Sequence, residues 1–374
     1  MQRRRPDSES ANPRGELDLI RRIRARAALT GGSALRLGIG DDCALLRPRP
    51  GEEIAVTTDL SIAGRHFRLD WHSPESIGHR ALARGLSDLA AMGARPIAAF
   101  LSLGLPRDLA HFSGRSKARG NKDLQLQPWI DAFLNGLLTL AAAHKTPLAG
   151  GDLSESPVAL ADIVLIGAVP RGKALLRSGA RPGDLLYVTG ALGGASAGLA
   201  RLAQLAHLAQ PAAADSLRSR PPRISRELAP LLAPHLYPQP RVPQGLWLQR
   251  RSLASAAIDL SDGLSTDLAH LCQESGVAAE VDAARLPIHS GATLQQALHG
   301  GEDYELLFTA PPDARVPGKI AAVPISRIGR VVAKKRNRPD VTLITPQGRE
   351  TLEPQGWEHF SWDLTSVMPI RPMK

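Results

Sequence analysis

The sequence predicts an α+β (mixed α/β) fold in two domains. Length is the first indication, because 374 residues exceed what one hydrophobic core usually organises. Composition is the second, since 43% hydrophobic and 22% charged residues are ordinary for a globular chain. Pattern is the third: short apolar runs rich in β-branched residues alternate with longer segments of helical period.

The first predicted domain spans residues 17–172 and follows a polar tail at 1–16. Its expected elements are a helix at 16–28, a strand at 54–58 ending at Asp59, a helix at 77–92, a strand at 97–103, a helix at 129–144, a short strand at 147–149, a turn at 150–152 and a strand at 161–169. Gly93 supplies the stop signal of the 77–92 helix.

The second predicted domain spans residues 173–364, before a tail at 365–374. Its expected elements are a turn at 181–184, a strand at 185–188, a glycine-rich bend at 189–198 that opens a helix, a strand at 256–260, a helix at 265–274 and strands at 278–281, 305–309 and 323–331. Residues 204–243 have the weakest pattern. Stretches near 113–125 and 205–227 resemble insertions without evident chemistry.

Charge and composition indicate whether nucleic acids or membranes are expected partners. The formal net charge is +10, yet the basic residues concentrate in tails and in loop-like stretches, and only 4% of residues are aromatic. We therefore expect no nucleic-acid partner. No stretch approaches the roughly 18 apolar residues of a membrane span, and the two cysteines form no CxxC pair, which predicts a cytoplasmic protein without membrane contacts.

Acids beside small residues recur along both predicted domains. They occur in Gly40-Asp41-Asp42, Thr57-Thr58-Asp59, Ser87-Asp88, Gly151-Asp152 and Asp259-Leu260-Ser261-Asp262-Gly263. Converging carboxylates repel one another unless cations lie among them, and oxygen ligands of this kind suit Mg²⁺. Each piece alone is also a common turn dipeptide, and Arg84 lies one helical turn before Asp88 and could simply pair with it.

The bend at 189–198 is only weak evidence for a phosphate-binding site. It lacks the Gly-Lys-Ser/Thr of a Walker loop and does not match GxGxxG. A strand, a turn and a helix in this order permit anion binding at the helix start, but close packing of the helix on the strand explains the glycines equally well.

Eight segments resemble the thiamine-monophosphate kinase family, within the superfamily of aminoimidazole ribonucleotide synthetase. They are LGIGDDCALL (37–46), VTTDLSIAGRHF (56–67), LSDLAAMGARP (86–96), GGD (150–152), LLRSGARPGDLLYVTG (175–190), AIDLSDGLSTDL (257–268), GGEDYELLFT (300–309) and GWEHF (356–360). The resemblance implies the two-domain architecture of that superfamily and a homodimer joined through strands of the N-terminal domain. It departs at Gly85, where relatives commonly carry Asn, and at Gly194, where an acid is common.

The resemblance also implies roles for individual residues around ATP and Mg²⁺. The implied metal ligands are Asp42, Thr57, Thr58, Asp59, Asp88, Asp152, Asp259 and Asp262, with Asp59 and Asp262 serving catalysis through the metal. The implied nucleotide contacts are Gly151, Asp152, Arg177 and Ser261, and the implied contacts to thiamine phosphate are His66, Glu302 and Trp357. His66 could instead be an ordinary loop histidine, and Trp357 an ordinary core residue.

The expected reaction is phosphorylation of thiamine phosphate to thiamine diphosphate. The acceptor phosphate is largely ionised at neutral pH, because its second pKa is about 6, so no general base is required. We therefore expect direct in-line transfer assisted by several Mg²⁺ ions. The alternatives are another ATP-using member of the superfamily, similar to selenophosphate synthetase or aminoimidazole ribonucleotide synthetase, or a non-catalytic nucleotide- or RNA-binding protein.

Overall fold

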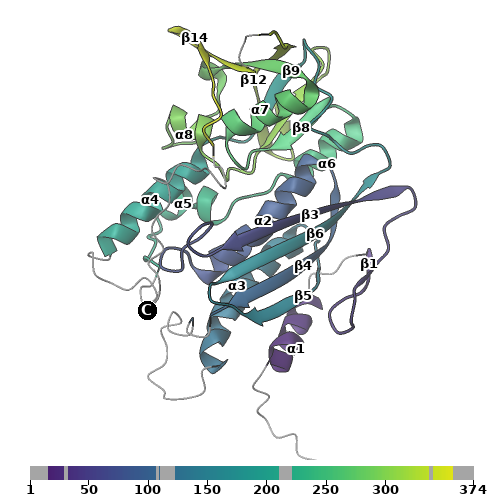
Figure 1. The fold of residues 1–374 in the computed structure, drawn as a ribbon, viewed down its shortest axis with the longest axis vertical. Helices are drawn as coiled ribbons and strands as arrows, with labels where there is room; N and C mark the ends of the chain where they lie inside the picture. Colours follow the sequence, from purple (N-terminus) through teal and green to yellow (C-terminus); the bar gives the residue numbers. More distant parts are fainter. Residues whose placement is uncertain are drawn as a thin grey trace, which may run out of the picture. The chain divides into compact units, whose positions relative to one another are not determined.

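The computed structural model describes residues 16–28, 33–106, 109, 123–209, 221–336 and 340–356 (Figure 1). The chain divides into two compact units. Unit 1 combines Met1–Leu175 with Gly198–Leu253, and unit 2 combines Leu176–Ala197 with Ala254–Lys374.

Unit 1 is built around a four-stranded sheet in the order β3-β6-β4-β5. The strands are β3 (Glu52–Ile62), β4 (Arg95–Leu105), β5 (Leu148–Glu155) and β6 (Leu160–Pro170). The pairs are antiparallel except β4 with β5, which is parallel. A short hairpin of β1 (Leu35–Leu37) and β2 (Leu45–Leu46) precedes the sheet in sequence.

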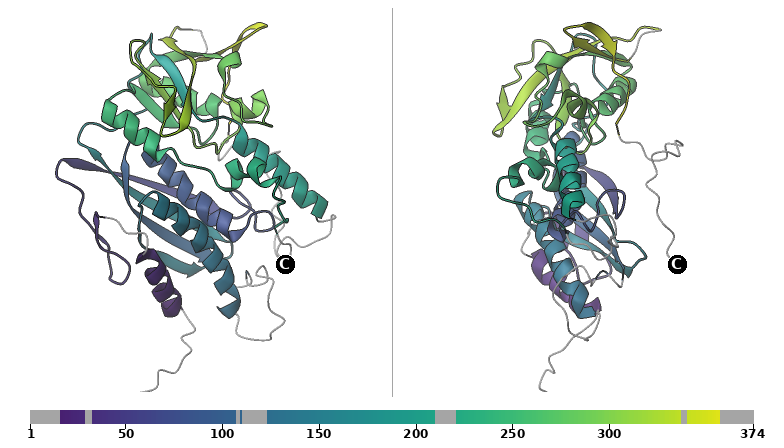
Figure 2. Two further views of the ribbon diagram at one scale, coloured as in Figure 1. Left: turned by 180° about the vertical axis from the view of Figure 1, so that it is seen from behind. Right: turned by 90° about the vertical axis from the view of Figure 1, so that its left-hand side faces the viewer.

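Helices cover one face of this sheet, as Figure 2 shows from behind. The helices described wholly within unit 1 are α1 (Glu16–Ala27), α2 (Pro74–Ala91), α3 (Asp123–Ala143), α5 (Ala229–Leu236) and α6 (Val242–Arg251). Helix α2 lies against β3, β4 and β6, and α3, α5 and α6 pack beside α2. The other face of the sheet is free of helices within the described part of unit 1 (Figure 1).

Local sequence explains where α2 starts and why it packs closely. The Ser73 side chain accepts a hydrogen bond from the amide of Ser76, and Pro74 occupies the first turn, where its missing N–H costs nothing. A Cβ on Gly78 would lie 2.0 Å from the carbonyl oxygen of Phe133 in α3. Glycine therefore allows the backbones of α2 and α3 to approach each other.

Unit 2 contains an eight-stranded sheet with the path β14-β13-β9-β12-β7-β10-β8 and β11 paired to β12. The strands are β7 (Leu185–Thr189), β8 (Ala256–Asp259), β9 (Val277–Asp282), β10 (Leu306–Ala310), β11 (Lys319–Ile320), β12 (Val323–Ala333), β13 (Val341–Thr345) and β14 (Gly348–Thr351). Its helices are α7 (Leu264–Ser275), α8 (Leu294–His299) and the short 3₁₀ helix Ala283–Arg285. Helix α4 (Gly194–Ala209) begins in unit 2 and continues beyond its boundary.

The predicted α+β class is confirmed, and two local expectations are corrected. The predicted turn at 150–152 lies inside β5, because Gly150 and Gly151 pair with Phe100 and Leu101 of β4. The predicted strand ending at Asp59 continues to Ile62, so this acid lies in the middle of a strand.

The division at residue 172 stays a prediction, and the structure groups some residues differently. Residues Gly198–Leu253 belong to unit 1, whereas the sequence assigned them to the second domain. The physical reason is packing onto α2: His79 of α2 bonds to the carbonyl oxygen of Pro238 at 2.8 Å, and α6 packs along the same helix. No helix in the described ranges has an apolar stretch long enough to cross a bilayer.

Candidate functional site

The side chains of β3 alternate between the two faces of the sheet. Thr57 and Asp59 point towards α2, since a Cβ built on Gly85 of that helix would lie 3.4 Å from Thr57 and 3.5 Å from Asp59. Thr58 is exposed and lies on the opposite face. Thr57 and Thr58 therefore cannot direct their side chains to one site from the same face.

Asp59, Asp88 and Thr57 form the first acidic group. The Thr57 hydroxyl donates a hydrogen bond to Asp88 Oδ2. Arg84 Nε lies 3.4 Å from Asp59 Oδ1 in an ion pair whose side chains are each less than one fifth exposed. Asp59 Oδ2 is buried and accepts no hydrogen bond from the described residues. An orphaned, buried carboxylate oxygen of this kind is costly unless a ligand completes its contacts.

Burial raises the pKa of the Asp59 carboxyl above its ordinary value. The Arg84 guanidinium opposes this shift, and the nearby Asp162 carboxylate adds to it. The ionised form of Asp59 is therefore poorly solvated in the folded protein, which favours a cation beside it.

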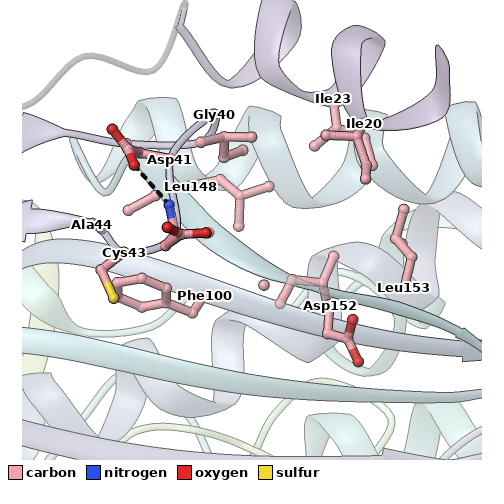
Figure 3. A pocket seen from close by; sticks show the side chains of 17 residues that line it. Ile20, Ile23, Gly40, Asp41, Cys43, Ala44, Phe100, Leu148, Asp152 and Leu153 are labelled. Carbon is pink, nitrogen blue, oxygen red and sulfur yellow. Dashed lines mark hydrogen bonds between the residues drawn. The ribbon is translucent and has the colours of Figure 1, made fainter. Parts of the chain in front are cut away.

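A second group lines a pocket of about 600 Å³ in unit 1. Asp42 comes from the loop between β1 and β2, and Gly151 and Asp152 come from β5. Figure 3 labels Asp152 on the wall of this pocket. In that loop the Asp42 amide donates to Asp41 Oδ1 at 3.0 Å, the bond drawn as a dashed line. A Cβ on Gly151 would lie 1.9 Å from the Leu101 carbonyl oxygen, and its φ is +148°, so only glycine fits there.

A third acidic group lies in unit 2, at the end of β8. Asp259 is the last residue of that strand and is buried, and Asp262 lies in the turn before α7. The sequence reasoning missed Asp267, whose carboxylate accepts hydrogen bonds from the amides of Asp262 at 3.1 Å and Gly263 at 3.0 Å. Its place in the first turn of α7, an acid where helix amides lack partners, was the available signal.

Burial raises the pKa of Asp267, the Asp259 and Asp262 carboxylates add to this shift, and together they bring the pKa to about 8 despite the two amide bonds. The three acids are therefore close enough to repel one another appreciably. Ser261 lies between two of them, and its carbonyl oxygen accepts a hydrogen bond from the Glu302 amide at 2.8 Å. Unit 2 thus brings one predicted substrate residue beside the predicted metal and nucleotide residues of the same loop.

The remaining predicted residues lie at separate places. His66 follows β3, and its Nδ1 accepts a hydrogen bond from the Ile62 amide at 3.1 Å, which fixes the ring orientation. Arg177 is exposed, and its carbonyl oxygen accepts a hydrogen bond from the Ser275 hydroxyl at 2.8 Å. Trp357 lies outside the described residues.

These acid groups fit magnesium held jointly with phosphates. Across the residues that the structure describes, no three His, Cys, Asp or Glu side chains gather closely enough to cage an ion by themselves. Mg²⁺ is usually bound by one or two carboxylates together with water and substrate phosphates, so an all-protein cage is not required. The Asp59 and Asp88 pair, with the orphaned oxygen of Asp59, meets that requirement.

Comparisons with known proteins place the chain in a family. The family model for the N-terminal domain of AIR synthase related protein matches residues 40–169. The model for the C-terminal domain of the same family matches residues 181–342. The chain is 37% identical over 359 residues to the thiamine-monophosphate kinase of Escherichia coli strain K12, covering 93% of this chain and 98% of that protein.

Solved structures agree with the sequence relatives. The thiamine-monophosphate kinase of Stenotrophomonas maltophilia K279a is 37% identical, with a TM-score of 0.67 over 88% of this chain and 96% of that one. AaThiL complexed with AMPPCP and TMP is 28% identical, with a TM-score of 0.66 over 94% of this chain and 100% of that one. The chain is therefore an enzyme of the thiamine-monophosphate kinase family.

Proposed function

We propose that this protein transfers the γ-phosphoryl group of ATP to thiamine phosphate, giving thiamine diphosphate during thiamine biosynthesis. The observation that carries the proposal is likeness over almost the whole chain to a kinase complexed with AMPPCP and TMP, at 28% identity. The acid groups support it, because phosphoryl transfer needs positive charge held by carboxylates around the phosphates.

Mg²⁺ would be held by Asp59, Asp88 and the Thr57 hydroxyl on the β3–α2 side of unit 1. The other proposed ligands are Asp42, Thr58, Asp152, Asp259 and Asp262, with Thr58 contributing through its backbone because its side chain lies on the other face. When bound, the metal ions neutralise phosphate charge and polarise the transferred group. The orphaned oxygen of Asp59 supports this assignment.

The chain's own residues would bind the nucleotide and the acceptor. Gly151, Asp152, Arg177 and Ser261 are the proposed nucleotide contacts, and Gly151 can contribute only its backbone. His66, Glu302 and Trp357 are the proposed contacts to thiamine phosphate, in which a tryptophan ring would stack on the flat cationic ring. Because the acceptor oxygen is already ionised near neutral pH, no side chain has to remove a proton.

We further propose a homodimer joined through the helix-free face of the β3-β6-β4-β5 sheet. That face exposes Ile54 at 47%, Val56 at 59% and Leu60 at 44%, next to half-buried Val164 and Ile166 of β6. Apolar sheet faces of this kind normally have a partner. Val56→Glu should reduce the mass measured by light scattering towards that of one chain; an unchanged mass would contradict this interface.

The decisive test incubates the protein with ATP, Mg²⁺ and thiamine phosphate, followed by chromatographic separation of the products. We expect thiamine diphosphate and ADP in equal amounts, and no diphosphate from free thiamine, which lacks the anionic acceptor. Turnover of selenide or of a ribonucleotide precursor instead would favour a sister activity of the same superfamily. We expect the reaction to take place in the cytoplasm, without nucleic-acid or membrane partners.

A further inference from the structure

A carboxylate from a distant segment occupies the start of α4. The Gly193 amide donates to Asp303 Oδ2 at 2.6 Å, and the Ala195 amide donates to Asp303 Oδ1 at 3.0 Å. These N–H groups begin the helix that follows the glycine-rich bend. The chain therefore supplies its own anion at the position where the sequence suggested a weak phosphate site.

Asp303 lies between two residues with strained backbones. Glu302 has φ +67° and Tyr304 has φ +51°, both in the left-handed region that residues with a Cβ adopt at a cost of about 1–2 kcal/mol each. Neither residue is glycine, although glycine would avoid this cost. The surrounding contacts must therefore impose this conformation on residues 302–304.

Backbone bonds to the loop after β8 hold the flanks of this segment. The Glu302 amide donates to the Ser261 carbonyl oxygen at 2.8 Å, and the Tyr304 amide donates to that of Leu260 at 2.9 Å. Tyr304 as a whole is 3% exposed, which anchors the segment in the core. Asp303, the middle residue of the three, adds a side-chain connection to the start of α4.

The nearby acid Glu305 accepts a hydrogen bond from strand β7. Glu305 Oε2 accepts a hydrogen bond from the Thr189 hydroxyl at 2.6 Å, and Thr189 Oγ1 accepts one from the Leu306 amide at 2.8 Å. Burial raises the pKa of Asp303, the two amide bonds oppose this shift, Glu305 and Glu302 add to it, and the resulting pKa is about 7. Keeping three acids within four residues of one loop is costly, and the inward contacts of Asp303 and Glu305 fix how they are arranged.

We propose that Asp303 is a positioning residue for the phosphate acceptor: by binding the first amides of α4, its carboxylate fixes the 302–304 turn and so holds Glu302 in the orientation that contacts thiamine phosphate. This proposal rests on the proposed function. The nucleotide side of the loop is held independently, because Asp267 accepts the amides of Asp262 and Gly263. Loss of the Asp303 carboxylate should therefore weaken binding of thiamine phosphate and leave binding of ATP nearly unchanged.

The test compares Asp303→Asn with the matched control Asp184→Asn. Asparagine presents an NH₂ group to one of the two amides, which removes a charge-assisted bond and creates a clash of donors. Asp184 Oδ2 accepts the Arg181 amide at 2.9 Å and the Ser255 hydroxyl at 2.6 Å in the same unit, far in sequence from the 302–304 turn. Both variants should melt at a lower temperature than the parent protein.

Only Asp303→Asn should raise KM for thiamine phosphate, by about tenfold or more, while KM for ATP stays within about twofold. Binding of thiamine phosphate without ATP, measured by calorimetry, should weaken by the same factor. An unchanged KM for thiamine phosphate would overturn the proposal, as would equal rises for both substrates or the same rise in Asp184→Asn. If Asp303→Asn does not fold, Asp303→Ser keeps a capping oxygen and should show a smaller rise in the same KM.

Hydrogen exchange separates this proposal from the proposed function. In Asp303→Asn, the amides of Gly193, Ala195, Glu302 and Tyr304 should exchange faster than in the parent protein, whatever the substrate is. Unchanged exchange at Glu302 and Tyr304 would refute the positioning role. Failure of the parent protein to bind thiamine phosphate would instead refute the proposed function.

Discussion

Replacing Asp59 with asparagine tests whether the β3–α2 acids form a metal site. The structure sets two opposing contributions in the metal-free protein. Losing the charge of the Arg84 ion pair, whose side chains are each less than one fifth exposed, should cost about 1 kcal/mol, because asparagine keeps an oxygen that can still accept a hydrogen bond from Arg84 Nε. Removing the charge from the buried, unbonded Oδ2 should gain about 1–3 kcal/mol, because a buried charged oxygen carries a larger penalty than the neutral amide group that replaces it, although that group also stays unbonded.

The expected result is an unfolding free energy that stays level or rises by up to about 2 kcal/mol. For a unit of this size, 1 kcal/mol corresponds to about 2–4 °C in Tm. Stabilisation by Mg²⁺-ATP should change in the opposite direction. At a concentration of about 100 times Kd it amounts to about 2.7 kcal/mol, and a hundredfold weaker site would retain only about 0.4 kcal/mol.

Thermal melts with and without Mg²⁺-ATP measure both quantities in one experiment. Two further variants serve as controls. Asp162→Asn removes a neighbouring charge that we do not assign to the metal, so it should leave the ligand-induced shift nearly unchanged. Arg84→Met leaves the Asp59 carboxylate without that counter-charge, so Tm should fall without metal and recover with Mg²⁺-ATP. A lower Tm in Asp59→Asn with an intact ligand-induced shift would refute the metal assignment.

Two further predictions concern stability. His72 Nε2 lies 2.9 Å from His235 Nε2 in a buried pair, and burial lowers the pKa of His72 to about 3. Because the unfolded chain binds protons below pH 6.5 and the folded His72 does not, each such histidine should cost about 2 kcal/mol between pH 7 and pH 5. Urea unfolding at both pH values should show this loss, and His235→Gln should reduce it; an equal loss in the variant would contradict this cause. Gly151→Ala should destabilise unit 1 by more than about 2 kcal/mol, because its Cβ would meet the Leu101 carbonyl oxygen, whereas Gly318→Ala, whose Cβ meets no described atom within 4 Å, should change the same urea midpoint little.

Periodicity was sufficient for the fold class and for the main helices. The apolar spacing of α2 and its glycine stop follow directly from the 3.6-residue repeat, and the observed helix begins at Pro74 and ends at Ala91. The Gly-Gly-Asp segment was misjudged as a turn because local propensity cannot register a neighbouring strand. Pairing with β4 supplies the hydrogen bonds that keep these glycines extended.

In the candidate site, too, local sequence does not show which side chains from distant segments meet. The acids that a motif identifies are those whose neighbours along the chain are distinctive, as in Asp259 and Asp262. Asp303 was not identified as a cap, because its partners Gly193 and Ala195 lie more than a hundred residues earlier. Likewise Thr57 and Thr58 share one motif, yet the two-residue period of β3 sends their side chains to opposite faces. A sequence motif specifies which donors are present, whereas the register of the strands and the start of a distant helix decide which of those donors can act together.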